Sequence, residues 1–241
     1  MMALKNEFEV TGNWLFKYRS FLPLIIIPFL FYCILTPLEI YIQKILLYTG
    51  IIISYIGECI RIFTIAYVPA GTSGRNTKQQ LASTLNKHGI YSTVRHPLYL
   101  GNFFIFLGPF IFTGNIYGVI IFILIFWIYY ERIMFAEEAF LMDKFDDEYQ
   151  EWSLNTPAFI PHPILYSRIN TKFSLNKVLE REYSGICGVI VIFSILLAYR
   201  NYYFNVIPIL SDNWKVLFIV NTMLYISLRT YKKIRRIRKK L

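Results

Sequence analysis

Two groups of polar side chains in this sequence are able to do chemistry, and each lies beside an apolar run. Arg95, His96 and Tyr99 stand at the start of one run, and Glu137-Glu138 come just after the next one. Gly114-Asn115 is a turn signal between these runs, so they should form a hairpin with both polar groups at one membrane face. A guanidinium, an imidazole, a phenol and two carboxylates can together grip a ligand with both positive and negative parts. The sequence therefore predicts an active site where the two groups meet.

The composition indicates a membrane protein. The 241 residues are 56% apolar and 18% aromatic, above the ~45–50% apolar share of a soluble domain. The apolar residues also come in long uncharged runs. We expect an all-α integral membrane protein of about six transmembrane helices with a cytoplasmic cofactor pocket. The predicted spans are residues 20–38, 45–67, 98–113, 116–133, 183–199 and 215–228.

The chain divides into four predicted segments. Residues 1–19 form an interfacial N-terminal segment, and residues 20–67 form a transmembrane hairpin. Residues 68–163 hold the catalytic core, with the Arg-His-Pro loop, a helical hairpin and the Glu-Glu helix. Residues 164–241 form a C-terminal transmembrane pair with a basic tail. Because mostly polar residues precede the first apolar run, no cleaved signal peptide is expected.

The distribution of charge predicts the topology. The formal net charge is +10, and of 25 basic residues 22 fall on one side of the predicted spans and three on the other. This positive-inside bias places the active site and both termini in the cytoplasm. Eight basic residues lie in 229–240, directly after an apolar run. Such a cluster favours anionic lipid headgroups over nucleic acid as a partner.

Metal and redox chemistry are not indicated. His88, His96 and His162 are far apart and lack the spacing of metal ligands. The three cysteines fall inside apolar runs without C-x-x-C spacing, which is typical of small buried residues. No metal is therefore expected, and the oligomeric state stays open.

Local patterns around the two polar groups predict how helices present them. Pro97 suits the first position of a helix, so His96 should occupy the cap position, where the helix N-terminus favours an anion. After Glu137-Glu138, apolar residues at Leu141, Phe145 and Tyr149 recur every four positions and should form one buried stripe. The proline-rich stretch 156–163 should end this helix as an extended segment.

Three further residues are candidates for binding the substrate. Glu58 and Arg61 lie three apart near the end of the second span, so they either form an ion pair or line a polar cavity. Arg75 stands in a Gly/Ser/Thr-rich loop whose backbone N–H groups can hold a phosphate, although the loop lacks P-loop spacing. An ordinary solvated loop is the alternative.

The spacing of these features resembles a known family. Gly89-x-Tyr91-x-x-x-Arg95-His96-Pro97-x-Tyr99-x-Gly101, then Glu137-Glu138 with the Leu141 stripe, then Pro157-x-x-Ile160-Pro161, is similar to the isoprenylcysteine carboxyl methyltransferase and phospholipid methyltransferase superfamily. The resemblance implies S-adenosylmethionine as cofactor and Arg95, His96 and Glu138 as catalytic residues. It implies a cofactor pocket formed by Tyr91, Arg95, His96, Tyr99, Gly101, Glu137 and Glu138. The sequence departs from the family at Asp146, where many relatives have Gly, and at Trp152, where Tyr is frequent.

The acceptor is less closely defined. Residues 12–23 and 71–78 resemble a bacterial branch associated with methylation of lipid A 1-phosphate, which makes that phosphate the expected acceptor. Phosphatidylethanolamine N-methylation and prenylcysteine carboxyl methylation remain alternatives. An anionic oxygen acceptor needs no general base, whereas an amine acceptor does. An NADPH-dependent membrane reductase and a non-enzymatic lipid-binding protein are the competing hypotheses from other classes.

Overall fold

The computed structural model describes residues 3–69, 80, 82–169 and 171–238, and within these ranges the fold is helical. The helices are α1 (Leu4–Tyr18), α2 (Ile27–Cys33), α3 (Ile40–Tyr67), α4 (Ile90–Thr93), α5 (Pro97–Thr113), α6 (Ile116–Asn155), α7 (Leu175–Arg181), α8 (Tyr183–Tyr203) and α9 (Asp212–Arg238). Two 3₁₀ helices, η1 (Leu22–Ile26) and η2 (Pro163–Leu165), lie between them. An isolated β-bridge joins Gly89 and Ser167. The prediction of an all-α fold is confirmed for the part of the chain that the structure describes.

The helical hairpin that carries the two polar groups is formed by α5 and α6. Gly114 ends α5 in the left-handed conformation (φ 70°), which costs glycine little because it has no Cβ. Asn115 then caps α6, and its side chain accepts a hydrogen bond from the Gly118 N–H at 2.9 Å. The helix continues without a break past the apolar part to Glu137 and Glu138. The turn predicted at 114–115 is confirmed.

The tightest packing in the bundle is between α3 and α5. A Cβ on Gly50 would lie 2.5 Å from the carbonyl oxygen of Gly108. One on Gly57 would lie 2.7 Å from the backbone nitrogen of Ile105. Between these contacts, the Ser54 hydroxyl donates to the Ile105 carbonyl at 3.0 Å. Small residues thus let the two backbones approach closely, as is common between helices in membranes.

Three of the described helices are long and apolar enough to cross a membrane, namely α3, α6 and α8. Shorter apolar helices cover residues 24–33 and 97–113, and α9 is not among the candidate spans. The chain is an integral membrane protein, but the structure gives fewer full spans than the six expected. The predicted span 20–38 is replaced by η1 and the seven-residue α2, because its prolines interrupt regular helix formation. Residues 40–44, which lie between the first two predicted spans, belong to α3 in the structure.

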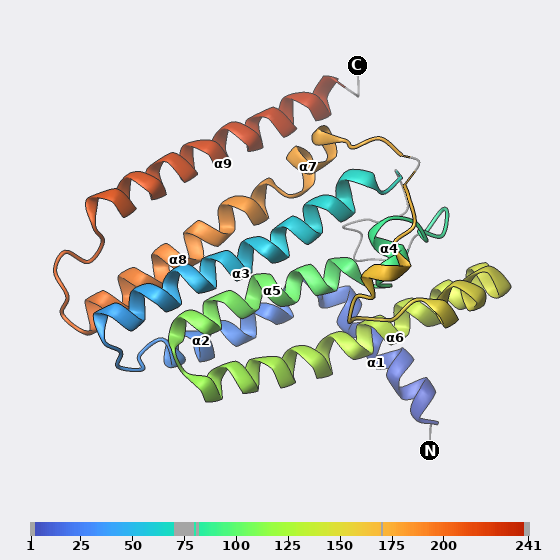
Figure 1. Ribbon diagram of the computed structural model, residues 1–241, viewed down its shortest axis with the longest axis horizontal. Coiled ribbons are helices and arrows are strands. Elements are labelled where there is room, and N and C mark those ends of the chain that lie inside the picture. The colour runs from blue at the N-terminus through green and yellow to red at the C-terminus, as the bar shows by residue number, and fades with distance from the viewer. Residues whose placement is uncertain (1–2, 70–79, 81, 170, 239–241) are drawn as a thin grey trace.

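The polar segments gather at one end of the bundle. Figure 1 shows the last turns of α3 and α9 beside α4 and α7, all at the end opposite to the α5–α6 turn. Helix α1 packs along α6, where Arg132 donates to the Thr11 hydroxyl at 3.1 Å and Phe8 meets Phe135 edge-on. Gly12 is buried at this contact. The N-terminal segment is therefore docked on the helix that carries Glu137 and Glu138.

The opposite end of the bundle is held by a buried arginine. Arg200 on α8 is 2% exposed, and it donates to the carbonyl of Thr36 at 2.5 Å. Its other terminal nitrogen donates to the carbonyl of Thr113, the last residue of α5, at 3.5 Å. The Thr113 carbonyl is at a helix end and lacks a partner within its helix. One guanidinium here donates hydrogen bonds to carbonyls of two chain segments.

A backbone kink divides α6 at Asp146. The residue has φ 41° and ψ −118°, a conformation that glycine adopts readily and other residues do not. This is the position where the sequence departs from the Gly of many relatives. The helix resumes after the kink and buries Tyr149, while Leu141 and Phe145 are partly buried. The predicted stripe is thus present, although its last member follows the kink.

We expect Asp146→Gly to stabilise the protein by about 1 kcal/mol, because relieving ~1–3 kcal/mol of backbone strain outweighs the greater freedom of glycine in the unfolded chain. The thermal midpoint of purified protein in detergent measures this. The matched control is Asp147→Gly, the next position along, where the backbone is regular helix. That variant should lose about 0.5–1 kcal/mol. An equal drop in the thermal midpoint for both substitutions would contradict backbone strain at Asp146.

Candidate cofactor site

The Arg-His-Pro loop is held in place by the proline-rich segment that follows α6. The backbone N–H of Arg95 donates to the Pro157 carbonyl at 2.9 Å, and that of His96 donates to the Ala158 carbonyl at 3.2 Å. The N–H of His162 in turn donates to the Thr93 carbonyl at 2.9 Å. Segments more than 60 residues apart in the sequence therefore fix each other. The stretch 156–162 ends α6 as a non-helical segment, as predicted, but it contains bends and is followed by η2 at Pro163.

His96 occupies the N-cap position of α5, and Pro97 is the first helical residue, as predicted. The imidazole is buried at 6% exposure. The N-terminus of α5 carries the positive end of the helix dipole. This end of the helix therefore presents a partial positive charge beside the Arg95 guanidinium.

Glu138 connects the two polar groups. Its Oε1 lies 2.8 Å from His96 Nε2, and its Oε2 lies 3.3 Å from an Arg95 terminal nitrogen. The neighbouring Glu137 carboxylate lies farther from the imidazole, 3.7 Å from Nδ1. Both carboxylates are a quarter to a third exposed. The structure thus brings together Arg95, His96, Glu137 and Glu138 from segments about 40 residues apart in the sequence.

Tyrosine rings form the walls around these charges. Tyr99 stacks on His96 with ring centroids 5.6 Å apart. Tyr91 on α4 is within electrostatic reach of Glu137 and Arg61. Burial and the Glu137 carboxylate raise the pKa of its phenol, so it stays protonated. Tyr149, beyond the kink, is buried beside Glu138 and Arg95. The site therefore combines charged groups with aromatic surfaces.

The structure places two of the predicted substrate-binding residues, Glu58 and Arg61, in contacts between helices. Arg61 is committed to protein contacts, because its guanidinium binds the Glu182 carboxylate at 2.8 and 2.9 Å and Asn102 at 2.7 Å. Glu58 is 1% exposed and lies against Gly185 of α8. The structure pairs Arg61 with Glu182, and Glu58 also contributes to the electrostatic environment of Arg61. Arg75 lies outside the described residues.

Gly101, predicted to contact the cofactor, faces α3. A Cβ there would lie 2.5 Å from Arg61 Cγ and 2.8 Å from the Gly57 carbonyl oxygen. Close helix packing alone accounts for a glycine at this position. Its role in cofactor binding stays a prediction.

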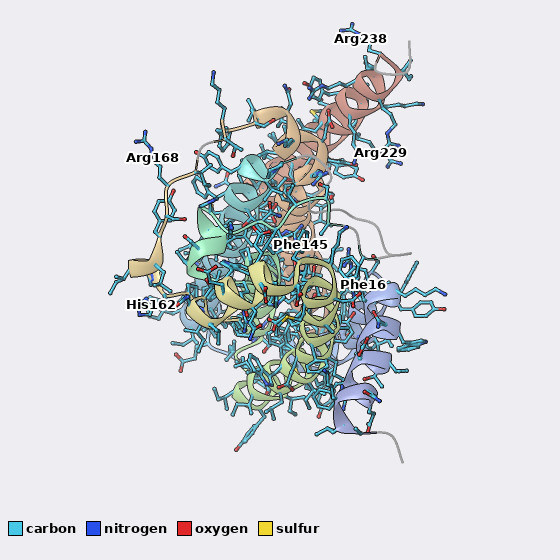
Figure 2. All side chains as sticks on the ribbon, turned by 90° about the vertical axis from the view of Figure 1, so that its right-hand side faces the viewer. Phe16, Phe145, His162, Arg168, Arg229 and Arg238 are labelled. Atoms are coloured by element: carbon cyan, nitrogen blue, oxygen red, sulfur yellow. The ribbon has the colours of Figure 1, made fainter. Side chains whose placement is uncertain are left out.

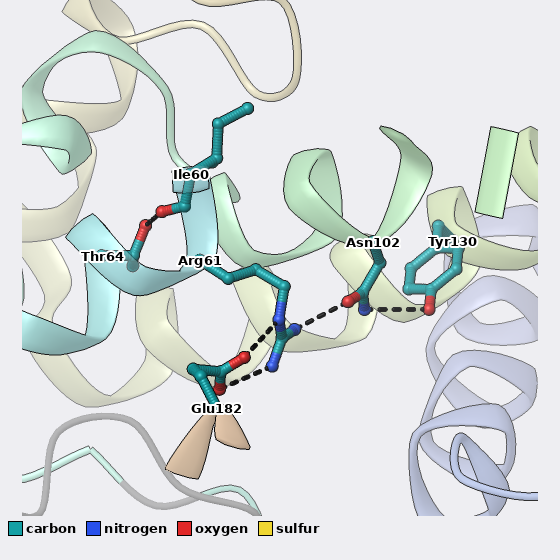
Figure 3. A network of polar contacts seen from close by, with 6 residues as sticks. All are labelled: Ile60, Arg61, Thr64, Asn102, Tyr130 and Glu182. Carbon is teal, nitrogen blue, oxygen red and sulfur yellow. Dashed lines mark hydrogen bonds and ion pairs between the residues drawn. The ribbon is translucent and has the colours of Figure 1, made fainter. Parts of the chain in front are cut away.

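Sequence reasoning missed the polar network beside the site. Figure 3 shows Arg61 between Glu182 and Asn102, with Asn102 also reaching the Tyr130 hydroxyl. A carboxylate at 182, directly before an apolar run, and an arginine near the end of another run were available signals. The register of the two helices, which the sequence does not reveal, was needed to pair them. Among the residues that the structure describes, no three His, Cys, Asp or Glu side chains are arranged so that they could hold a metal ion.

Comparison with known proteins shows which family part of this chain resembles. Residues 45–148 match the family described as phospholipid methyltransferase. The chain is similar to protein-S-isoprenylcysteine O-methyltransferase of Schizosaccharomyces pombe, with 34% identity over 95 residues, 37% of this chain and 40% of that protein. The Saccharomyces cerevisiae enzyme of the same name is 33% identical over 115 residues, 46% of this chain and 47% of its own length. The cobalt-zinc-cadmium resistance protein CzcN of Cupriavidus metallidurans is 36% identical over 84 residues, 35% of this chain and 38% of that protein.

The chain spans less than half the length of these three relatives. No solved structure is a significant match. The matched region contains most of α3, all of α5 and most of α6, and with them Arg95, His96, Glu137 and Glu138. Enzymes of this group are methyltransferases that use S-adenosylmethionine. Residues 45–148 are thus similar to the phospholipid methyltransferase family and to protein-S-isoprenylcysteine O-methyltransferases.

Proposed function

We propose that this protein is an S-adenosylmethionine-dependent methyltransferase that acts on a membrane lipid or a lipid-linked acceptor. The observation that carries this proposal is the convergence of Arg95 and His96 on Glu138 at the N-terminus of α5. All three residues lie within the segment that matches the family. The apolar helices on either side of the site support an acceptor that lies in the membrane.

The residues present fit this cofactor. The Arg95 Nε is buried and has no hydrogen-bond partner among the described residues, so the guanidinium can form a two-pronged bond with a carboxylate. The N-terminus of α5 favours the same negative group. Glu137 and Glu138 can accept from an ammonium or from ribose hydroxyls, and Tyr91 and Tyr99 offer rings to a cation.

Methyl transfer requires the side chains to bind and orient the cofactor and the acceptor, and little else. When bound, S-adenosylmethionine supplies an electrophilic methyl group on a sulfonium. A phosphate or carboxylate acceptor is already anionic at neutral pH, so no side chain has to remove a proton. The roles of Arg95, His96 and Glu138 are then to align the reactants and stabilise their charges. The names of the two yeast relatives, both O-methyltransferases, support an oxygen acceptor.

The specific acceptor that we propose is the 1-phosphate of lipid A. Its support is the resemblance of residues 12–23 and 71–78 to the bacterial branch associated with that reaction. In the structure, Gly12 packs α1 against the helix that carries the two glutamates, so the first of these segments adjoins the site. Glu58 and Arg75 stay candidates for the acceptor side, whereas the Arg61 guanidinium is held by Glu182 and Asn102.

We further propose that the site end of the bundle faces the cytoplasm of a bacterial inner membrane. The excess of basic residues on that side supports this orientation. Figure 2 shows Arg229 and Arg238 extending from α9 away from the bundle. Arg235 is paired with Glu180 at 2.8 Å, whereas Arg229, Lys233 and Arg236 are exposed. These exposed cations suit anionic lipid headgroups.

Mass spectrometry of total lipids, including lipid A, from cells with and without the gene tests the acceptor. The proposal predicts one methyl group on the lipid A 1-phosphate that disappears with the gene. A change confined to phosphatidylethanolamine would replace the phosphate acceptor with an amine. Unchanged lipids, together with no transfer of labelled methyl groups from S-adenosylmethionine to membrane lipids, would contradict the methyltransferase itself.

A further inference from the structure

We infer that Asn102 is a positioning residue for this site. It ties the Tyr130 hydroxyl to Arg61 and thereby holds Tyr99 against His96. The inference rests on the proposed function, because it takes Tyr99 to line the cofactor pocket. It assigns a role to an amide that lies in the middle of an apolar stretch and contacts neither His96 nor Glu138 in the structure.

Asn102 forms one hydrogen bond with Arg61 on α3 and one with Tyr130 on α6 (Figure 3). Its Oδ1 accepts from an Arg61 terminal nitrogen at 2.7 Å, and its Nδ2 donates to the Tyr130 hydroxyl at 3.2 Å. The amide thus uses its acceptor toward α3 and its donor toward α6. An apolar side chain of the same size would leave the Arg61 N–H and the Tyr130 hydroxyl without these partners.

The Arg61 end of this network is rigid. The guanidinium forms a two-pronged pair with Glu182, from Nε at 2.8 Å and from a terminal nitrogen at 2.9 Å. Glu182 is 1% exposed and is the N-cap residue of α8. A planar guanidinium held at two points has a fixed orientation. Arg61 therefore presents a third donor to Asn102 from a framework formed by α3 and α8.

At the other end of the Asn102 network, Tyr130 contacts a residue of the cofactor site. The Tyr130 ring stacks on Phe126 with centroids 4.2 Å apart and contacts Tyr99 with centroids 5.0 Å apart. Tyr99 in turn stacks on His96, whose Nε2 binds Glu138. Both tyrosines are buried, Tyr130 at 4% and Tyr99 at 8% exposure. In a close-packed interior, a shift of the Tyr130 ring therefore displaces Tyr99.

The test uses Asn102 and Tyr130 and avoids Arg61 and Glu182. Removing one partner of a buried ion pair leaves an uncompensated charge and endangers folding. Asn102→Leu removes both amide contacts, and Tyr130→Phe removes only the hydroxyl and keeps the ring. We expect each variant to weaken equilibrium binding of S-adenosylhomocysteine by about tenfold, the equivalent of one lost hydrogen bond. The double variant should also lose about tenfold, because both changes break the same contact.

The matched control is Asn221→Leu. Asn221 is a buried amide that donates to the Cys187 carbonyl at 3.0 Å, between α9 and α8. It should lower the thermal midpoint as Asn102→Leu does and leave the affinity for S-adenosylhomocysteine unchanged. A purely structural role for Asn102 would make the two variants behave alike.

Wild-type affinity in Asn102→Leu would overturn the positioning role, and so would a hundredfold loss in the double variant, which would indicate independent effects. A wild-type protein that does not bind S-adenosylhomocysteine would overturn the proposed function and the positioning role together. The failure of the inference alone is therefore distinguishable from the failure of the function.

Discussion

Glu138→Gln lowers kcat/KM for methyl transfer from S-adenosylmethionine by about 100-fold, because the change removes the charge that holds His96 and Arg95. Hydrogen bonds to charged groups contribute ~1.5–3 kcal/mol each, and one side chain makes both contacts here. The carboxylate lies 2.8 Å from the imidazole and 3.3 Å from the guanidinium. Transfer of labelled methyl groups to membrane lipids by purified protein measures this effect.

The matched control lies on the same helix. Glu148 pairs with Lys87 at 2.7 Å, but both side chains are exposed, and an exposed ion pair contributes little. Glu148→Gln should therefore keep kcat/KM close to the wild-type value. If both variants retained wild-type activity, Glu138 would not belong to the catalytic machinery.

Gly57→Leu should prevent α3 and α5 from packing and destabilise the protein by at least ~3 kcal/mol, the upper range for overpacking a core. A Cβ at this position would lie 2.7 Å from the backbone nitrogen of Ile105 and 2.8 Å from the Phe104 Cβ. Backbone atoms of a facing helix cannot move aside as a flexible side chain does. The yield of monodisperse protein and its thermal midpoint in detergent measure the loss.

Gly188→Leu is the control for this substitution. Gly188 lies on α8, and a Cβ there would meet nothing within 4 Å. The same gain in side-chain volume in an apolar helix should therefore leave the thermal midpoint near the wild-type value. Equal loss in both variants would mean that leucine in a membrane helix, and not the α3–α5 contact, causes the destabilisation.

The local features of the site could be predicted from the sequence because short-range chemistry determines them. The turn at Gly114-Asn115 and the start of α5 at Pro97 depend on residues within one helical turn. The meeting of Arg95 and His96 with Glu138 followed from one additional assumption, that the two apolar runs form a hairpin. The structure confirms each of these predictions.

The remaining differences arise from contacts that the order of residues does not specify. Arg61 pairs with Glu182 across 121 positions, and that pairing depends on how α3 and α8 are aligned. The prediction of a span at 20–38 rested on the number of apolar residues. It underestimated how far the prolines shorten the helix. Asp146 was seen as a departure from the family pattern, but its positive φ could be known only from the backbone.

Equilibrium binding of S-adenosylhomocysteine to the purified protein tests the central claim most directly. The claim is that Arg95, His96 and Glu138 form the cofactor site. Titration calorimetry should show one binding site in the wild type, binding about 100-fold weaker in Glu138→Gln, and no binding of NADPH to either protein. Wild-type protein that binds NADPH and not S-adenosylhomocysteine, or equal affinity of the wild type and Glu138→Gln for S-adenosylhomocysteine, would contradict it.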